Sequence, residues 1–407
     1  MITRRDAVML LAAAPIAAVG PLRAQAPSTR RIISAGLDTF MIESDGTVKG
    51  WSLTEPYGWR FGLGHANRVP KYTAFTTPGL RNVVAMAAAT NTAYALLSNG
   101  TIVAWGGNAR GELGATPLAE VEVSASGRAT AASPLPVLGI TDAIGIAAGD
   151  YHALAVTRGG QVFVWGYGLY DQLGIEMPII EYKTRSPAAM QYLPFPIRIP
   201  GLNDVVAVAA GSQHSLALLK DGTIRAWGNN KGGQVGDGTT ITRKTPVPVV
   251  GVRNAVAIAA DSGISAAILA DGTVMTWGDG NSALGRKTFT RDAPHPAPAL
   301  VDGVTGIRAL ALGSIHMVAL TNAGTVMSWG DNMIGEIGHP GANPRPIAGL
   351  TSVTSVEAYT GRTFAVLANG TIMALGHVPY WARVDGSDPT TVGWPIPLVI
   401  KNLNNPL

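Results

Sequence analysis

The sequence predicts an all-β protein, a seven-bladed β-propeller, on three observations. One phrase recurs seven times along the 407 residues. Each copy holds the turn residues and the β-forming residues of a tight hairpin. No segment of useful length shows a helical period. A hydrophobic fraction of 47% supplies a core. A repeat of this kind indicates modules that bury their apolar faces only against one another, and seven four-stranded modules form a closed propeller.

The repeated phrase runs from a two-residue turn to a tryptophan. In the fourth copy, Asp221-Gly222-Thr223-Ile224 leads to Trp227. Asp-Gly and Asn-Gly supply the positive-φ pair that a two-residue hairpin turn needs, so each phrase predicts a hairpin. The six tryptophans of the phrase lie 50 to 62 residues apart: Trp51, Trp105, Trp165, Trp227, Trp277 and Trp329. Leu375 takes the same position in the seventh copy.

Two further segments complete each module. Small residues such as Ile146-Ala147-Ala148-Gly149 precede the hairpin and suit an inner strand near a crowded axis. Further upstream, Pro-x-Pro segments such as residues 246–248 predict an outer or edge strand, which we expect to begin the same module. The first module lacks this strand before residues 31–34, and residues 395–400 supply one at the other end of the chain. We therefore expect the N- and C-terminal segments to pair within one blade and close the ring.

Residues 1–26 carry the pattern of a signal peptide. An arginine pair, Arg4-Arg5, precedes a short apolar stretch, and small residues follow at an A-x-A spacing. The pattern is similar to a twin-arginine export signal. We expect residues 27–407 to form the propeller in the periplasm or outside the cell, without membrane contact once the signal is removed. An uncleaved membrane anchor is the alternative, for which the apolar run is short.

The charge of the chain gives little indication of a polyanionic partner. Its formal net charge is +4, and removal of residues 1–26 takes away three arginines against one aspartate, which leaves about +2. No run of Lys and Arg exceeds two residues. We therefore expect no nucleic-acid partner. We expect the protein to be a monomer.

The repeated phrases, taken together, resemble the regulator of chromosome condensation repeat. They read Ala-Ala-Gly-x-x-His, Asp-Gly-Thr-Ile, Trp-Gly-x-Asn and Gly-Gln-x-Gly, and they cover about residues 30–403. The resemblance implies a seven-bladed propeller with interlocking ends. The eukaryotic founder of the family is a guanine-nucleotide exchange factor for a small nuclear GTPase. Exported bacterial members include an inhibitor that clamps β-lactamases with one propeller face, and the predicted export signal favours that compartment.

The polar residues of the repeat do not form a catalytic or metal-binding set. His152, His214 and His316 occupy one position in three modules. Equivalent positions on a ring point to different sectors, so we interpret them as structural residues. The phrase Asp261-Ser262-Gly263 resembles a serine-protease nucleophile motif but fills the same part of the repeat in the fifth module. The absence of Cys excludes thiolate metal sites and a Cys nucleophile. We therefore expect no catalytic residue, no metal and no cofactor.

The departures from the repeat are aromatic residues in the loops that follow the tryptophan position. Equivalent loops lie on one face of a ring, and exposed aromatic side chains there are typical anchors of protein interfaces. We expect a non-enzymatic scaffold that binds a protein partner through these residues: Tyr57, Trp59, Phe61, Tyr167, Tyr170, Tyr380 and Trp381. The alternatives are that the aromatics pack under their own loops, that an enzymatic site lies at the ring mouth, or that the protein is a binding protein similar to the β-lactamase inhibitor.

Overall fold

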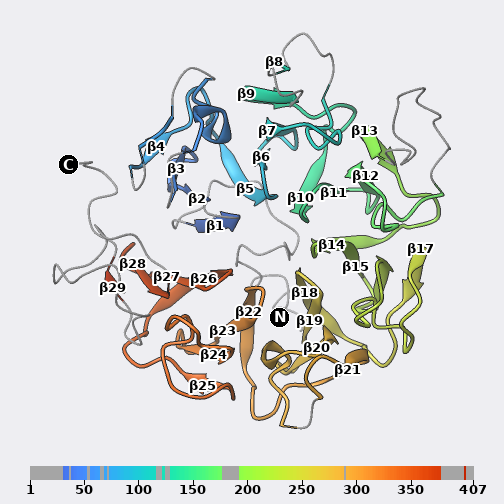
Figure 1. Cartoon of the computed structure of the whole chain (residues 1–407), viewed down its shortest axis with the longest axis vertical. Helices are drawn as coiled ribbons and strands as arrows, with labels where there is room; N and C mark the ends of the chain where they lie inside the picture. The colour runs from blue at the N-terminus through green and yellow to red at the C-terminus, as the bar shows by residue number, and fades with distance from the viewer. Residues whose placement is uncertain are drawn as a thin grey trace, which may run out of the picture.

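Seven antiparallel sheets surround a central axis in the computed structural model, which confirms the predicted all-β propeller with seven blades (Figure 1). The structure describes residues 31–35, 38–52, 56–64, 68–70, 73–115, 122–123, 129–176, 192–287, 290–376 and 398–399. Within them, no helix is long and apolar enough to cross a membrane. The predicted signal peptide, residues 1–26, lies outside the described residues.

The blades follow one another in chain order, and within each the strands run outward from the axis. Blade 1 consists of β1 (Arg31–Ala35), β2 (Asp38–Ile42), β3 (Val48–Ser52) and β4 (Phe75–Thr76). Blade 2 consists of β5 (Val83–Ala88), β6 (Thr92–Leu97), β7 (Ile102–Gly107) and β9 (Ala129–Pro136), with β8 (Glu122–Val123) outside β9. Blade 3 consists of β10 (Ala143–Ala148), β11 (His152–Thr157), β12 (Val162–Tyr167) and β13 (Tyr192–Arg198).

The remaining four blades repeat this order. Blade 4 consists of β14 (Val205–Ala210), β15 (His214–Leu219), β16 (Ile224–Gly228) and β17 (Arg243–Pro248). Blade 5 consists of β18 (Ala255–Asp261), β19 (Ile264–Leu269), β20 (Val274–Asp279) and β21 (Pro294–Leu300). Blade 6 consists of β22 (Ile307–Leu312), β23 (His316–Thr321), β24 (Val326–Gly330) and β25 (Arg345–Pro346). Blade 7 consists of β26 (Val353–Tyr359), β27 (Arg362–Leu367), β28 (Ile372–Gly376) and β29 (Leu398–Val399).

The Asp-Gly turns form the predicted hairpins, but without the expected pair of positive φ angles: in the described residues only the glycine of each Asp-Gly or Asn-Gly turn has one. The N–H of Gly222 donates to the carbonyl of Leu219, and that of Leu219 to the carbonyl of Thr223, so the connection is a three-residue loop that needs a single positive φ. In blade 4, β15 pairs with β16 up to Leu218 opposite Ile224, and Gly222 takes a φ of 79°. The carboxylate of Asp221 accepts hydrogen bonds from both the backbone N–H and the hydroxyl of Thr223, at 2.9 and 2.6 Å. Aspartate, glycine and threonine therefore act together, because each satisfies a different requirement of the turn.

The Pro-x-Pro strands differ from the prediction in the blade that they join. The segment with Pro246 and Pro248 does not begin a blade. It forms β17, which pairs with the preceding tryptophan strand, as Val247 lies opposite Ala226. The outer edge of β16 is the nearest unpaired strand edge that the chain meets after the tryptophan. Pairing β17 with it closes only the short loop between the two strands, which costs little entropy. The remaining free edge of β17 tolerates proline because it pairs with no further strand.

The first and the last described strands lie in different blades. β29 pairs with β28 in blade 7, and β1 is the innermost strand of blade 1. Each of the seven described sheets is built from consecutive strands. The expected sharing of one blade by the N- and C-terminal segments is therefore not found among the described strands.

The seam between blades 7 and 1 closes by packing and polar contacts. β1 lies against β26. Ile32 and Trp51 from blade 1 belong to one buried apolar cluster with Phe364 from blade 7. The backbone N–H of Ser34 donates to Oε1 of Glu357 at 3.1 Å. These contacts join blade 7 to blade 1, so the ring is continuous at this point.

Candidate functional site

Two sets of loops meet on one face of the ring. In blade 3 the turn at residues 149–151 joins β10 to β11, and Tyr167 is the last residue of β12, directly before the next loop. His152 lies opposite Gly166 in the sheet, and the N–H of Tyr167 donates to the carbonyl of Tyr151 at 2.8 Å. Both loops therefore emerge at the same end of the blade. The same register recurs in the other blades, and we call this side the loop face. The Asp-Gly turns lie at the opposite end.

Buried histidines near the loop face form hydrogen bonds between neighbouring blades. Nε2 of His152, His214 and His316 lies 2.9, 2.8 and 3.1 Å from the hydroxyl of Ser215, Ser265 and Thr363, respectively. Each hydroxyl donates its single proton onward to a backbone carbonyl, that of Gln172, Gln234 or Glu336. The imidazole must therefore be the donor to the hydroxyl. We call each such pair a histidine latch.

The latch explains the glycine and the histidine of the Ala-Ala-Gly-x-x-His phrase. A Cβ atom on Gly313 would collide with the imidazole of His316, which covers that glycine. Burial lowers the pKa of His152 and His214 to about 3 and that of His316 to about 4, so the rings stay neutral. The structural interpretation of these histidines is confirmed. Within the described residues, no group of three His, Cys, Asp or Glu side chains could hold a metal ion.

At two of the interfaces that lack the histidine, between blades 5 and 6 and between blades 7 and 1, the residues on the two sides match in polarity. Ile264 takes the histidine position in blade 5, and the position that holds the hydroxyl in the neighbouring latches is Met317 in blade 6. Both belong to one buried apolar cluster. At the seam, Arg362 replaces the histidine, and its Nη1 donates to the hydroxyl of Thr39 at 3.2 Å. A polar residue therefore faces a hydroxyl across these interfaces, and an apolar residue faces an apolar one.

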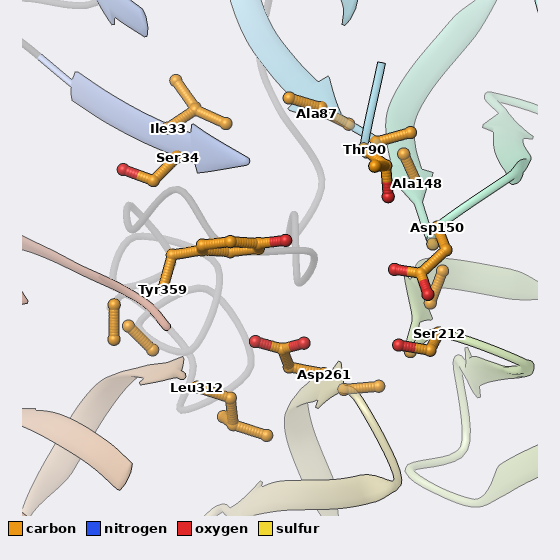
Figure 2. Close-up of a pocket in the computed structure, with 18 of the residues that line it drawn as sticks. Ile33, Ser34, Ala87, Thr90, Ala148, Asp150, Ser212, Asp261, Leu312 and Tyr359 are labelled. Atoms are coloured by element: carbon orange, nitrogen blue, oxygen red, sulfur yellow. The ribbon is translucent and has the colours of Figure 1, made fainter. Parts of the chain in front are cut away.

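The inner strands enclose a cavity of about 100 Å³ at the ring centre, on the side of the loop face. Figure 2 shows the carboxylates of Asp150 and Asp261 and the hydroxyl of Ser212 directed into it, with the ring of Tyr359 lying across it. Glu357 also lines the cavity, and no Lys, Arg or His is among the described residues that line it. Three acids thus share a small space with no basic side chain in its wall.

The environment of these acids favours their neutral forms. Burial raises the pKa of Asp261 to about 7, and Asp150 nearby acts in the same direction, while hydrogen bonds from Ser262 oppose both effects. Burial also raises the pKa of Glu357 well above its usual value and raises that of Asp150. No hydrogen bond joins two of these carboxyls in the described part of the chain.

Replacing Asp261 with asparagine should stabilise the protein in a pH-dependent way. The pKa rises from 3.8 in the unfolded chain to about 7 in the folded protein, so the folded state binds the proton more tightly. The free energy of unfolding of the natural protein therefore falls as the pH rises through this window. As the pH rises from about 4 to about 7, Asp261→Asn should become more stable than the natural protein. The difference in the free energy of unfolding should reach about 2 kcal/mol, after an allowance for partial exposure, and stay constant above about pH 7. Urea unfolding at pH 4.5, 6 and 8 measures the difference. The exposed Asp292→Asn is the control, and a pH-independent difference would contradict the expectation.

Six of the seven aromatic residues predicted as binding residues divide into three groups. Tyr57 and Tyr170 are exposed, with 49% and 38% of their surface accessible. Trp59 and Tyr167 are half-buried. Tyr380 and Trp381 lie outside the described residues, so the expected aromatic sector between blades 7 and 1 stays a prediction.

Phe61 is fully buried, which corrects its assignment to a binding surface. It belongs to η1 (Gly58–Phe61), and its ring lies 5.6 Å from that of Phe40 and fills the space above Gly50. Phe61 takes the place that Leu113 holds in the next Gly-x-Leu-Gly element. The apolar position of that element faces the core, so an aromatic substitution there is a packing residue and not an anchor.

Sequence reasoning missed three residues that extend the aromatic surface of blade 3. Tyr151 and Tyr170 both contact Tyr167, with ring centroids 6.3 Å apart in each pair. The guanidinium of Arg110, from blade 2, lies over the rings of Tyr151 and Tyr167, at 4.2 and 5.1 Å from their centroids. Leu169 beside them is 49% exposed. We call Arg110, Tyr151, Tyr167, Leu169 and Tyr170 the tyrosine–arginine patch. The register that places Tyr151 beside Tyr167 is the signal that would have identified it.

Comparison with known proteins agrees with this architecture. The family model described as the RCC1-like domain matches residues 15–302. The chain belongs to the RCC1-like domain family. Among solved structures, this RCC1-like domain is similar to yeast RCC1 (Prp20) bound to Kap60, with a TM-score of 0.68 and 21% identity, over 91% of this chain and 87% of that one. It is also similar to human WBSCR16, with a TM-score of 0.68 and 20% identity, over 88% of this chain and 93% of that one.

The curated relatives of this RCC1-like domain are longer proteins. The E3 ubiquitin-protein ligase HERC2 of Homo sapiens is 29% identical over 304 residues, which are 71% of this chain and 6% of that protein. The protein pim1 of Schizosaccharomyces pombe is 29% identical over 294 residues, which are 72% of this chain and 45% of that protein. The chain therefore spans less than half the length of these relatives, and the likeness covers the propeller.

Proposed function

We propose that this RCC1-like propeller is a non-enzymatic scaffold that binds a protein partner through its loop face. The observation that carries the proposal is the gathering of exposed and half-buried tyrosines on that face, above blades joined by histidine latches. Tyrosine anchors supply a large contact area with few rotatable bonds, so they lose little entropy on binding. The rigid ring keeps them in position before the partner arrives, which lowers the cost of association.

The related structures support the same type of function without supplying a partner. Yeast RCC1 was solved with Kap60 bound, and Prp20p of Saccharomyces cerevisiae is described with binding properties to Gsp1p and histones. Those partners belong to those proteins. For this chain we propose export to the periplasm or beyond, on the signal-like residues 1–26, and a partner in that compartment. A β-lactamase is one candidate, on analogy with the inhibitor noted above.

Site-specific photo-crosslinking tests the proposal. A photoreactive phenylalanine analogue at Tyr170 should crosslink a protein from periplasmic extract, because this side chain is exposed on the loop face. The same analogue at the exposed Arg158, in the turn after β11 on the opposite face, should give no crosslink to that protein. Purified β-lactamases, offered one at a time, test that partner class directly. Crosslinks only from Arg158, or from neither position, would contradict a binding role for the loop face.

A further inference from the structure

The tyrosine–arginine patch spans two neighbouring blades. Arg110 comes from the loop after β7 in blade 2, and the three tyrosines come from the turn after β10, the end of β12 and the loop that follows it in blade 3. Each tyrosine ring meets the next edge-on, with interplanar angles of 81° and 76°. Such edge-to-face pairs are favourable arrangements of aromatic rings. The patch is therefore one continuous surface, and its two halves are held together by contacts across a blade interface.

The base of the patch is rigid. Tyr151 directly precedes the latch residue His152, and the N–H of Tyr167 donates to the carbonyl of Tyr151 at 2.8 Å. The N–H of Arg110 donates to Oε2 of the buried Glu112 at 2.6 Å. The carbonyl of Glu112 in turn accepts a hydrogen bond from Trp165 of blade 3, at 2.8 Å. Both blades thus hold the backbone under Arg110, and its stacked side chain has already lost much of its rotamer freedom.

No ion pair joins the guanidinium of Arg110 to an acid in the described part of the chain. The ion pairs found there involve Lys49, Arg60, Arg243 and Arg291. The nearest acid in sequence, Glu112, is buried beneath the patch, where its carboxylate accepts the N–H of Arg110 and the charge of Arg110 lowers its pKa against the effect of burial. Asp150 points into the central cavity (Figure 2), and Asp171 has its pKa raised by burial and lowered by Lys244. The patch consequently offers five fixed N–H donors of a cation beside exposed apolar surface.

We propose that Arg110 receives a carboxylate side chain of the partner polypeptide, while an apolar side chain next to that carboxylate packs on Leu169 and Tyr170. The proposal rests on the proposed function and adds to it the chemistry of the partner. A planar guanidinium matches a carboxylate with two parallel hydrogen bonds, and the tyrosines around it exclude water as the partner docks. Stacked arginine and tyrosine are also the residue types that dominate binding energy at protein interfaces.

Peptide selection on the purified full-length protein tests this chemistry. A displayed library of random 12-residue peptides should yield binders with Asp or Glu next to an apolar residue. One such peptide, synthesised with the acid and again with the matching amide, should bind the natural protein at least about tenfold more tightly in its acid form. Arg110→Gln should weaken the acid peptide by the same factor and leave the amide peptide unchanged, because the two changes remove one interaction.

Three variants distinguish the possible outcomes. Arg110→Lys, which keeps the charge but not the planar fork, should recover only part of the affinity. Arg158→Gln, on the opposite face of blade 3, should bind both peptides as the natural protein does. Thermal unfolding of each variant excludes a folding defect. Peptides that lose affinity for Tyr170→Ala but bind equally well in their acid and amide forms would overturn the carboxylate proposal and leave the loop-face function standing. Selection of basic peptides would have the same meaning. Peptides whose affinity changes with neither Arg110→Gln nor Tyr170→Ala, or the absence of any selected peptide, would overturn both the carboxylate proposal and the loop-face function.

Discussion

Replacing Gly313 with alanine should destabilise the propeller, and removing the imidazole of His316 should relieve most of that loss. The three atoms nearest to a Cβ on Gly313 all belong to His316, and the backbone there has no positive φ that would itself oppose alanine. The overpacking should lower the free energy of unfolding by about 1–3 kcal/mol. His316→Ala alone should lower it by about 2–4 kcal/mol, because it leaves a cavity and removes the bond to Thr363.

The double variant decides whether the latch accounts for the glycine. Gly313→Ala with His316→Ala should be more stable than the sum of the two single losses by at least about 1 kcal/mol, because alanine then occupies the space of the missing ring. Chemical unfolding of the four proteins measures this coupling. Gly211→Ala combined with His316→Ala is the matched control, because these residues belong to blades 4 and 6, and it should be additive. Equal behaviour of the two pairs would show that the contact does not explain the repeat.

Arg362→Met should cause the largest loss of stability among single substitutions at the seam. Arg362 is 2% exposed, and Asp38, Glu357 and Tyr359 act on its charge. Burial lowers its pKa to about 10, so it remains a cation at neutral pH. Methionine preserves most of the length but removes the charge and the bond to Thr39. Removing one partner of a buried charged group generally lowers the free energy of unfolding by about 3–5 kcal/mol, which we expect to measure by urea unfolding at pH 7.

Two companion variants separate the charge from the packing. Glu357→Gln in the Arg362→Met background should leave the stability close to that of Arg362→Met, because burial already favours the protonated form of Glu357. Arg158→Met, at an exposed turn, should change the stability by less than about 0.5 kcal/mol. If Arg362→Met were as stable as Arg158→Met, the seam would not depend on this arginine, and the apolar cluster around Phe364 and Trp51 would account for the closure.

The parts of this fold that the sequence predicts are those determined by local chemistry. The Asp221-Gly222-Thr223 turn identifies its hairpin because the hydrogen bonds that form it span only two residues. The histidine position recurs in register with the turns, so its structural role followed from position alone. The blade count followed from the same spacing, since every module repeats both signals.

The features that were missed depend on which neighbour a segment meets. A Pro-x-Pro segment such as residues 246–248 lies between two tryptophan strands, and nothing in its own residues distinguishes the strand before it from the strand after it. The sequence predicted Phe61 as an exposed aromatic residue, because it stands among other aromatics in a loop. Its position in the Gly-x-Leu-Gly element, however, faces the core. Arg110 and Tyr151 belong to different blades, so only the three-dimensional contact at 4.2 Å reveals that they form one surface.

The side chains of the two residues between the glycine and the histidine take no part in the hydrogen bond of the latch. In blade 3 these are Asp150 and Tyr151, one directed into the central cavity and the other stacked on Arg110. Equivalent pairs in the other blades surround the same axis, and the ring tolerates Ser212-Gln213 or Ser314-Ile315 there with the latch intact. Substitutions at these residue pairs can therefore change binding specificity in evolution, one pair at a time, without changing the propeller that holds them. A protein engineer can randomise the same pairs for the same reason.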